Sequence, residues 1–237
     1  MIRVGCSGWS YKDWRGIVYP DELPQRRWLE HYQQLFDTVE LNSTFYRLPS
    51  EAAVEGWAAA ATPGFLYAFK LGAFGSHRKK LRDPETWMPN HLDRAGRLGG
   101  HLGPTLVQLP PRWKRNVQRL DEFLELVPSS MRFAVELRDP SWIHDDVFDL
   151  LRRRSVALCI HDLLQSHPFE LTTDWTFIRF HSGSRGQRGN YSESELEEWA
   201  QRIEAWKRKA DIYAYFNNDW EGFAIRNALW LEERLGV

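Results

Sequence analysis

Three residues of this 237-residue chain combine the chemistry of proton transfer with a position at or near the end of a short apolar stretch. Glu40 and Glu136 are carboxylates, and His181 is an imidazole. Side chains of these types act as general acids and bases in enzymes. We therefore predict that these three are the catalytic residues of an active site.

A second group of polar side chains has the chemistry of ligand binding. Arginine suits a carboxylate or phosphate, because its planar guanidinium group binds such groups through two parallel hydrogen bonds. Amide side chains suit hydroxyl groups or nucleobases. The candidate substrate-binding residues are Asn42, Tyr46, Lys70, Gln108, Arg138, Arg179 and Asn217. Together they predict a small, polar, anionic ligand.

Pairs of these residues lie two positions apart, as Glu40 and Asn42 do and as Glu136 and Arg138 do, with an apolar residue between them. Side chains alternate between the two faces of a β-strand, so both members of a pair share one face. A polar end repeated at strand after strand is typical of a barrel whose parallel strands all end at one mouth. We therefore expect the candidate residues to line a common cavity there.

The rest of the chain supplies the elements that such a barrel needs. Eight apolar segments alternate with segments of helical spacing, which predicts an α/β protein with a parallel sheet. The predicted strands are residues 2–7, 37–42, 65–71, 104–109, 132–138, 156–161, 175–181 and 211–217. Eight repeats favour a (β/α)8 barrel of the TIM type, and we interpret residues 1–237 as a single domain. Residues 162–174 are too short for a full helix, so the helix between strands six and seven should be irregular or missing.

The overall composition limits the partner and the compartment only broadly. The formal net charge is −1, which favours neither nucleic acid nor an acidic partner at the level of the whole molecule. No apolar run approaches the roughly 20 residues of a membrane span, and no signal segment precedes the first strand. Cys6 and Cys159 lie in apolar runs and should be buried free thiols. We expect a cytoplasmic protein with no membrane partner, and the sequence specifies no oligomeric state.

Metal binding is less favoured by the same residues. Glu40, Glu136, His161, Asp162 and His181 have the donor atoms of a mixed metal site. The chain has no H-x-x-x-H or paired-cysteine spacing, however, and the nearby cations oppose a divalent ion. We therefore expect no metal and no cofactor.

Two further interpretations give these polar residues a structural role. Charged residues at one mouth can pair with one another in an internal salt-bridge network that only closes the barrel. Ser7 stands between glycines but lacks the G-x-S-x-G spacing of a nucleophile, so we interpret it as a tight-turn residue.

Basic segments provide an alternative to a small-molecule site. Residues 77–82, 112–115 and 184–191 follow predicted strands and would rise around the mouth, whereas residues 152–154 would lie at the opposite end. Basic loops with aromatic residues can follow a phosphate backbone, although solvated loop charge is the commoner case. Nucleic-acid binding or processing is therefore an alternative function.

Several motifs resemble, in the same order, those of the YecE-like family, known as domain of unknown function 72. They are VGCSGW at residues 4–9, VELNSTFY at 39–46, QLPP at 108–111, ELRDPSW at 136–142, IRFHSG at 178–183 and YFNN at 215–218. The resemblance runs from the first strand to the last and implies a TIM-type barrel, but no established activity. The matched residues are Glu40, Asn42, Thr44, Tyr46, Gln108, Glu136, Arg138, Arg179, His181 and Asn217. Ser182 departs from the family pattern, in which glycine directly follows the histidine.

The leading hypothesis is an enzyme, either a hydrolase, a lyase or an isomerase, that uses acid/base chemistry on a small anionic substrate such as a phosphorylated sugar or a nucleotide fragment. Arg138 and Arg179 would bind the anion, and Asn42, Gln108 and Asn217 would orient the substrate. A non-catalytic ligand sensor that uses the same pocket is a further alternative beside nucleic-acid binding.

Overall fold

All eight predicted strands are present in the computed structural model, which describes residues 1–164, 167–183 and 189–237. The strands are β1 (Ile2–Cys6), β2 (Thr38–Leu41), β3 (Leu66–Lys70), β4 (Leu102–Gln108), β5 (Phe133–Glu136), β6 (Ala157–His161), β7 (Trp175–Phe180) and β8 (Asp211–Phe216). Neighbouring strands pair in parallel in the order β1-β8-β7-β6-β5-β4-β3-β2. This is the arrangement of a (β/α)8 barrel, and it brings all carboxyl ends of the strands to one mouth.

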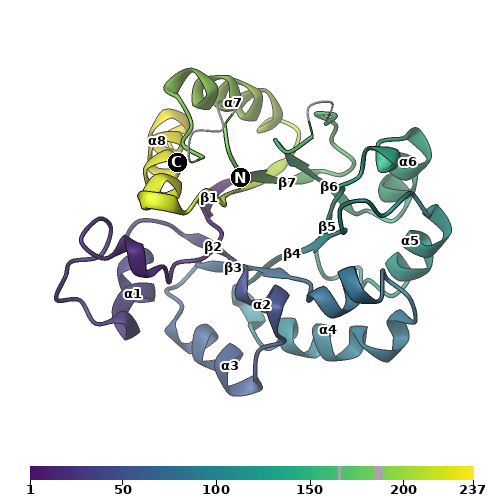
Figure 1. Cartoon of the computed structure of the whole chain (residues 1–237), viewed down its shortest axis with the longest axis horizontal. Coiled ribbons are helices and arrows are strands. Elements are labelled where there is room, and N and C mark those ends of the chain that lie inside the picture. Colours follow the sequence, from purple (N-terminus) through teal and green to yellow (C-terminus); the bar gives the residue numbers. More distant parts are fainter. Residues whose placement is uncertain (165–166, 184–188) are drawn as a thin grey trace.

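Helices surround the central strands, as Figure 1 shows. They are α1 (Trp28–Tyr32), α2 (Ser43–Tyr46), α3 (Glu51–Ala60), α4 (Met88–Gly96), α5 (Val117–Leu124), α6 (Asp145–Arg153), α7 (Glu193–Trp206) and α8 (Phe223–Leu235). Ser50, Asn116 and Ser192 cap α3, α5 and α7, since each side-chain oxygen accepts a hydrogen bond from the backbone N–H three residues further on. These bonds satisfy donors that a helix leaves free at its first turn and fix where each helix begins.

Some connections depart from regular alternation, and two of them bear on the predictions. Between β6 and β7 the described residues form no helix, as the short spacing predicted. Between β3 and β4 the chain forms a π-helical turn at Phe74–Arg78 and 3-10 turns at Pro84–Thr86 and Gly99–His101 in addition to α4. A single π-helical turn is an irregular element that often occurs at functional sites.

The barrel interior is apolar at its centre and polar at the mouth. The central residues include Ala68, Leu106, Ala134, Phe177 and Tyr215, which are all fully buried. Side chains two positions further along each strand share the same face. These are Lys70, Gln108, Glu136, Arg179 and Asn217. The alternation of the strands therefore builds a polar layer directly above the apolar one.

A tyrosine side chain closes the seam between β1 and β2, which lie at the two ends of the hydrogen-bonded strand order. The Tyr32 hydroxyl accepts a hydrogen bond from the Cys6 N–H at 2.8 Å and donates to the Thr38 carbonyl at 3.0 Å. A Cβ at Gly5 would collide with the Thr38 carbonyl oxygen, so glycine is needed for this close approach. The phenol thus satisfies buried backbone groups that have no strand partner at the seam.

Cys6 and Cys159 are buried free thiols, as predicted. In the part of the chain that the structure describes, no helix has both the length and the apolar character needed to cross a membrane.

Candidate active site at the mouth of the barrel

Arg179 lies at the centre of the polar layer and is almost fully buried, with 1% of its surface exposed. Its Nε and Nη2 donate to the two carboxylate oxygens of Glu40 at 2.9 and 2.8 Å. Its Nη1 donates to Glu136 Oε2 at 2.8 Å and to Gln108 Oε1 at 3.2 Å. The sequence predicted that Arg179 binds a ligand anion. In the structure its Nε, Nη1 and Nη2 all donate to residues of the protein, so this guanidinium fixes two carboxylates and an amide in place.

The second oxygen of Glu136 faces two further groups. Arg138 Nη1 lies 2.8 Å from Glu136 Oε1, and His181 Nε2 lies 3.6 Å from it. Arg138 and Glu136 form an ion pair at this distance, although Glu136 Oε1, Arg138 Nη1 and His181 Nε2 are buried without a hydrogen bond of good geometry among the described residues. Asn217 Nδ2 donates to His181 Nδ1 at 3.1 Å, so the imidazole hydrogen is on Nε2. Glu136 Oε1 is thus the point on which the Arg138 guanidinium and the His181 imidazole converge.

The protonation states in this cluster follow from burial and charge. Burial alone would raise the pKa of Glu136, but Arg179, His181 and Arg138 outweigh it and hold this pKa well below its usual range. Burial lowers the pKa of His181; Glu136 opposes this effect, whereas Arg179 and Arg138 add to it, and the pKa remains below its usual value. At neutral pH the cluster therefore contains an ionised carboxylate beside a neutral imidazole.

Lys70 is a second buried cation, with 5% of its surface exposed. Its Nζ donates to Asn42 Oδ1 at 3.0 Å and lies 4.5 Å from the centre of the Phe45 ring. His77, from the π-helical turn, packs edge-on against the same ring at 4.9 Å. No carboxylate of the described residues forms an ion pair with Lys70. Burial and the nearby Arg179 lower the pKa of Lys70 to about 8.

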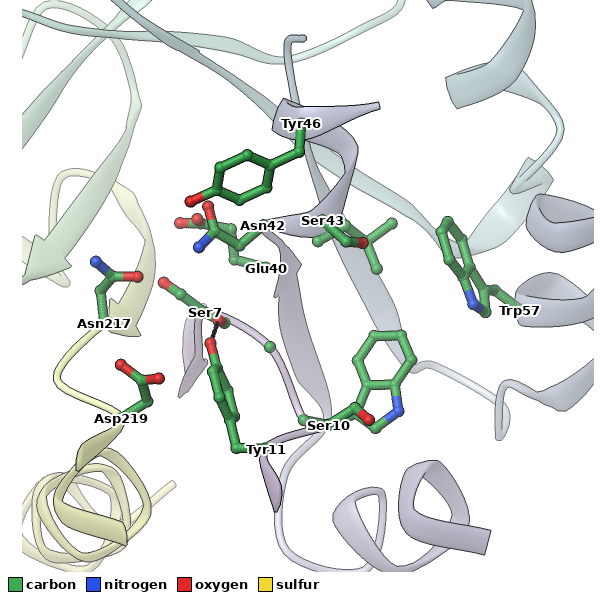
Figure 2. Close-up of a pocket in the computed structure, with 13 residues that line it drawn as sticks. Ser7, Ser10, Tyr11, Glu40, Asn42, Ser43, Tyr46, Trp57, Asn217 and Asp219 are labelled. Carbon is green, nitrogen blue, oxygen red and sulfur yellow. Dashed lines mark hydrogen bonds between the residues drawn. The ribbon is translucent and has the colours of Figure 1, made fainter. Parts of the chain in front are cut away.

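A cleft of about 570 Å³ opens beside this cluster, and Figure 2 shows the side chains that surround it. Glu40, Asn42 and Tyr46 lie on one side, with the Tyr46 ring above the other two. Asn217 and Asp219 lie on the side opposite the α3 helix. Among the described residues, the cleft is lined by two carboxylates, several amide and hydroxyl groups and aromatic rings, but by no cation.

The ten predicted residues therefore fall into two neighbouring groups. The cleft is lined by Glu40, Asn42, Tyr46 and Asn217. The remaining side chains form the ionic cluster behind it, and they are Lys70, Gln108, Glu136, Arg138, Arg179 and His181. Glu40 and Asn217 connect the two groups, because Glu40 binds Arg179 and Asn217 binds His181. Arg138 is the most exposed charged residue of the cluster, with 21% of its side chain accessible.

His161 and Asp162, which the sequence placed at the end of β6, have structural partners. His161 Nε2 lies 2.7 Å from a backbone carbonyl oxygen, and its Nδ1 accepts from a backbone N–H at 3.2 Å. The Asp162 carboxylate accepts from the backbone N–H groups of His181 and Ser182 at 3.1 and 3.2 Å and from the Tyr191 hydroxyl. Asp162 therefore anchors the loop that carries His181. The described residues contain no group of three or more His, Cys, Asp or Glu side chains that could hold a metal ion.

Sequence reasoning missed the aromatic side of the cleft. Trp57 belongs to the apolar stripe of α3, and helical spacing alone indicated that it packs on the sheet. In the structure it lines the cleft and meets Trp9 edge-on, with 6.2 Å between ring centres. Trp9 and Asp219 each lie three residues after the end of a strand, β1 and β8 respectively, and that position is the signal that would have identified them.

The basic segments around the mouth are partly neutralised by acidic neighbours. Lys79 pairs with Asp83 at 3.1 Å, and Arg115 pairs with Asp146 at 3.0 Å. Residues 184–188, which make up most of the basic segment after β7, lie outside the described residues. The described parts of these segments form separate ion pairs and give no added support to nucleic-acid binding.

The fold and the site together define a (β/α)8 barrel with an ionic cluster and an adjoining polar cleft at the carboxyl ends of its strands. The family model described as "Protein of unknown function DUF72" matches residues 3–237, so the chain belongs to this family. The motif resemblance is thereby confirmed.

Relatives and solved structures support this assignment. The chain is 31% identical to UPF0759 protein YecE of Escherichia coli (strain K12) over 143 residues, which are 60% of this chain and 50% of YecE, so the match spans half the length of that relative. It is 23% identical to UPF0759 protein YunF of Bacillus subtilis (strain 168) over 273 aligned residues, covering 100% of this chain and 95% of YunF. The crystal structure of a DUF72 family protein from Thermotoga maritima has a TM-score of 0.87 at 30% identity over 100% of both chains. The chain also shares its fold with D-psicose 3-epimerase from Clostridium cellulolyticum H10. That match has 11% identity and a TM-score of 0.58, and it covers 98% of this chain and 95% of the epimerase.

Proposed function

We propose that this protein is an enzyme that acts by acid/base chemistry on a small, sugar-like substrate with an anionic group. The observation that carries this proposal is the convergence of Glu136 Oε1, His181 Nε2 and Arg138 Nη1, which are buried without a well-formed hydrogen bond among the described residues. They lie behind Glu40 and Asn217, which line an open cleft. Buried polar atoms are rarely left unpaired in proteins. A substrate that reaches this point from the cleft would satisfy them.

The composition of the cleft supports a polyhydroxylated substrate. The amides of Asn42 and Asn217 can both donate and accept hydrogen bonds, as hydroxyl groups require. Trp9, Trp57 and Tyr46 add flat apolar surfaces that suit the carbon–hydrogen faces of a sugar ring. These features favour a neutral sugar-like part within the cleft.

The positive charges of the cluster support an anionic group at one end of that substrate. Three cations, Lys70, Arg138 and Arg179, accompany two carboxylates in the polar layer. Arg179 is engaged by both carboxylates, whereas Arg138 pairs with Glu136 through one nitrogen and Lys70 has no ion pair among the described residues. We assign the anion, a phosphate or a carboxylate, to Lys70 and Arg138.

Proton transfer is assigned to Glu136 and His181. Glu136 Oε1 is the carboxylate oxygen with free hydrogen-bonding capacity, whereas both oxygens of Glu40 are held by Arg179. An anion that engages Arg138 would weaken its effect on Glu136 and raise the pKa of that carboxyl toward the range of a useful base. The neutral His181, with its hydrogen on Nε2, would donate to an oxygen that gains negative charge. Glu40 stays in place as the cleft carboxylate that orients substrate hydroxyl groups.

Thermal-shift measurements with sugar phosphates and with the matching unphosphorylated sugars test this function. We expect stabilisation that is larger for the phosphates and is lost in Arg138→Ala but kept in Arg153→Ala, a control at the opposite end of the barrel. Glu136→Gln should keep ligand binding and lose turnover of the hit compound. Shifts that are equal in wild type and Arg138→Ala would refute the anion assignment, and turnover unchanged in Glu136→Gln would refute the base.

The same variant separates an enzyme from a ligand sensor. A sensor binds its ligand tightly in both wild type and Glu136→Gln, and neither protein turns the ligand over. If product analysis finds no conversion by wild type of any compound that stabilises it, the sensor replaces the enzyme as the function.

A further inference from the structure

A second cavity lies beside the cleft, and the proposed function does not use it. It has a volume of about 320 Å³ and is bounded by α2, the π-helical turn and α4. Its mainly apolar walls include Phe45, Leu48, Leu71, Phe74 and Trp87. A Cβ at Gly75 would collide with the Trp87 ring, so glycine lets the π-helical turn and this indole form one continuous wall. Tyr46 borders both the cavity and the cleft.

One buried polar side chain lines this cavity. His91, from α4, is 3% exposed and packs edge-on against Phe69 at 5.2 Å. Its Nε2 is buried without a hydrogen-bond partner among the described residues. Burial lowers the pKa of His91 to about 4, so the ring is neutral at physiological pH. An unpaired buried nitrogen destabilises a protein unless a ligand or water pairs with it.

We propose that this cavity binds a planar aromatic group that carries a hydrogen-bonding atom, such as a nitrogen heterocycle. Small-molecule sites are typically apolar cavities with a few well-placed polar groups, and His91 among aromatic walls meets that description. The Phe74 and Tyr46 side chains are 52% and 79% exposed, so a flat ring would remove apolar surface from water. Among the described lining residues Arg47 is the single charged one, and it lies exposed at the edge, which favours an uncharged occupant.

The position of Tyr46 extends this inference to the substrate. Because Tyr46 borders both spaces, one molecule can place a sugar-like part in the cleft and an aromatic part in the cavity. This extension rests on the proposed function, whereas binding of an aromatic ring in the cavity does not. The substrate class then becomes an anionic sugar-like compound that carries an aromatic substituent.

Two bicyclic probes of similar shape test the cavity. Benzimidazole carries a hydrogen-bond donor and an acceptor, and indane carries neither. In ligand-observed NMR titrations of the full chain, we expect benzimidazole to bind with millimolar affinity, as suits a compound of this size, and indane to bind at least fivefold more weakly. His91→Leu should remove that difference by weakening benzimidazole alone, without lowering the melting temperature, because no protein partner of Nε2 is lost.

Blocking variants from two separate elements show where the probes bind. Ala73→Phe, beside the π-helical turn, and Asn90→Phe, on α4, add a ring at the cavity and should each abolish the binding of both probes. Ala59→Phe adds the same ring on the exposed side of α3 and should change nothing. If one blocking variant does not fold, the other still decides the site. Absence of benzimidazole binding to wild type, or binding unaffected by the blocking variant, overturns the proposal.

The outcome is independent of the proposed function. Sugar phosphates report on Lys70 and Arg138, whereas benzimidazole reports on His91. Benzimidazole binding without any sugar-phosphate effect would support the cavity and reject the proposed function. The reverse result would support the proposed function and reject the cavity.

Discussion

Arg179 and Lys70 are both buried cations at the mouth of the barrel, but their surroundings differ. Arg179 is held by two carboxylates and an amide, so the cost of its burial is offset by charge-assisted hydrogen bonds. Lys70 has an amide oxygen and an aromatic face instead. Such partners offset only part of the cost of removing an ammonium group from water. The fold therefore tolerates a charge at Lys70 that it does not need for stability.

We predict that Lys70→Met stabilises the protein at pH 7, by about 2–3 kcal/mol in free energy of unfolding. The folded-state pKa of about 8 is lower than the value of 10.5 for a free lysine, so the folded state binds fewer protons than the unfolded state between these pH values. The free energy of unfolding of the wild type therefore increases as pH rises through this range. The difference in this free energy between Lys70→Met and wild type is largest below pH 8 and shrinks toward pH 10. Urea unfolding at pH 7 and pH 9.5 measures both effects.

The exposed Lys12→Met serves as the control and should show no pH-dependent difference from wild type over the same range. A Lys70→Met protein that is less stable than wild type by equal amounts at both pH values would contradict the prediction. If Lys70→Met stabilises the protein and also weakens ligand binding, Lys70 shows the behaviour expected of a functional residue.

The sequence predicted which polar residues reach the mouth, because a period of two fixes the face on which each strand residue lies. It did not predict which of them pair. Arg179 meets Glu40 across the barrel although 139 positions separate them in the chain. Such a contact depends on the distance between two strands that are not neighbours in the sheet. Residue type gives no information on that distance. Arg138 and Arg179 therefore appeared equivalent in sequence and are not equivalent in structure.

At the scale of elements, a side chain from α1 bridges the seam between β1 and β2. The Tyr32 hydroxyl satisfies a backbone donor on β1 and a backbone acceptor on β2. We predict that Tyr32→Phe lowers the free energy of unfolding by about 2 kcal/mol, because a buried N–H and a buried C=O lose this partner. Urea unfolding measures the loss, and faster hydrogen exchange of the Cys6 amide locates it at the seam.

Tyr46→Phe removes the same hydroxyl group from an exposed position, where 79% of the residue is accessible, and should leave stability unchanged. Equal effects of the two substitutions, or a destabilised Tyr32→Phe protein whose Cys6 amide exchanges at the wild-type rate, would show that the seam is closed in another way.

Local patterns predicted the elements but not their contacts with one another. Strand alternation and the capping residues were sufficient for all eight strands and for the starts of α3, α5 and α7. The bridge by Tyr32 joins three elements, and the aromatic period of α1 indicates only a buried face. The wall that Trp57 gives to the cleft was missed for the same reason, since helical spacing shows which face is apolar but not where that face ends.

At the scale of the whole molecule, the two ends of the barrel use charge differently. The mouth buries carboxylates beside arginines. At the opposite end, Glu232 on α8 is partly buried with Asp37 near it, and burial together with Asp37 raises the pKa of Glu232 to about 8. Arg3 forms an ion pair with Asp37 at 2.7 Å, so the nearby cation is engaged by the other carboxylate. This end should therefore respond to pH in the physiological range.

We predict that Glu232→Gln removes a pH-dependent loss of stability. The folded-state pKa of about 8 is higher than the value of 4.5 for a free glutamate, so the folded state binds more protons than the unfolded state between these values. Wild-type stability should fall as pH rises from about 4.5 to 8 and then level off. After allowance for solvent screening of a partly exposed side chain, the variant should exceed wild type by about 1–2 kcal/mol at pH 8.5 and match it at pH 4. Urea unfolding at the two pH values tests this, with the exposed neighbour Glu233→Gln as control. Glu232→Gln and wild-type curves that stay parallel across the range would mean that Glu232 is ionised in the folded state at pH 7 and would contradict the prediction.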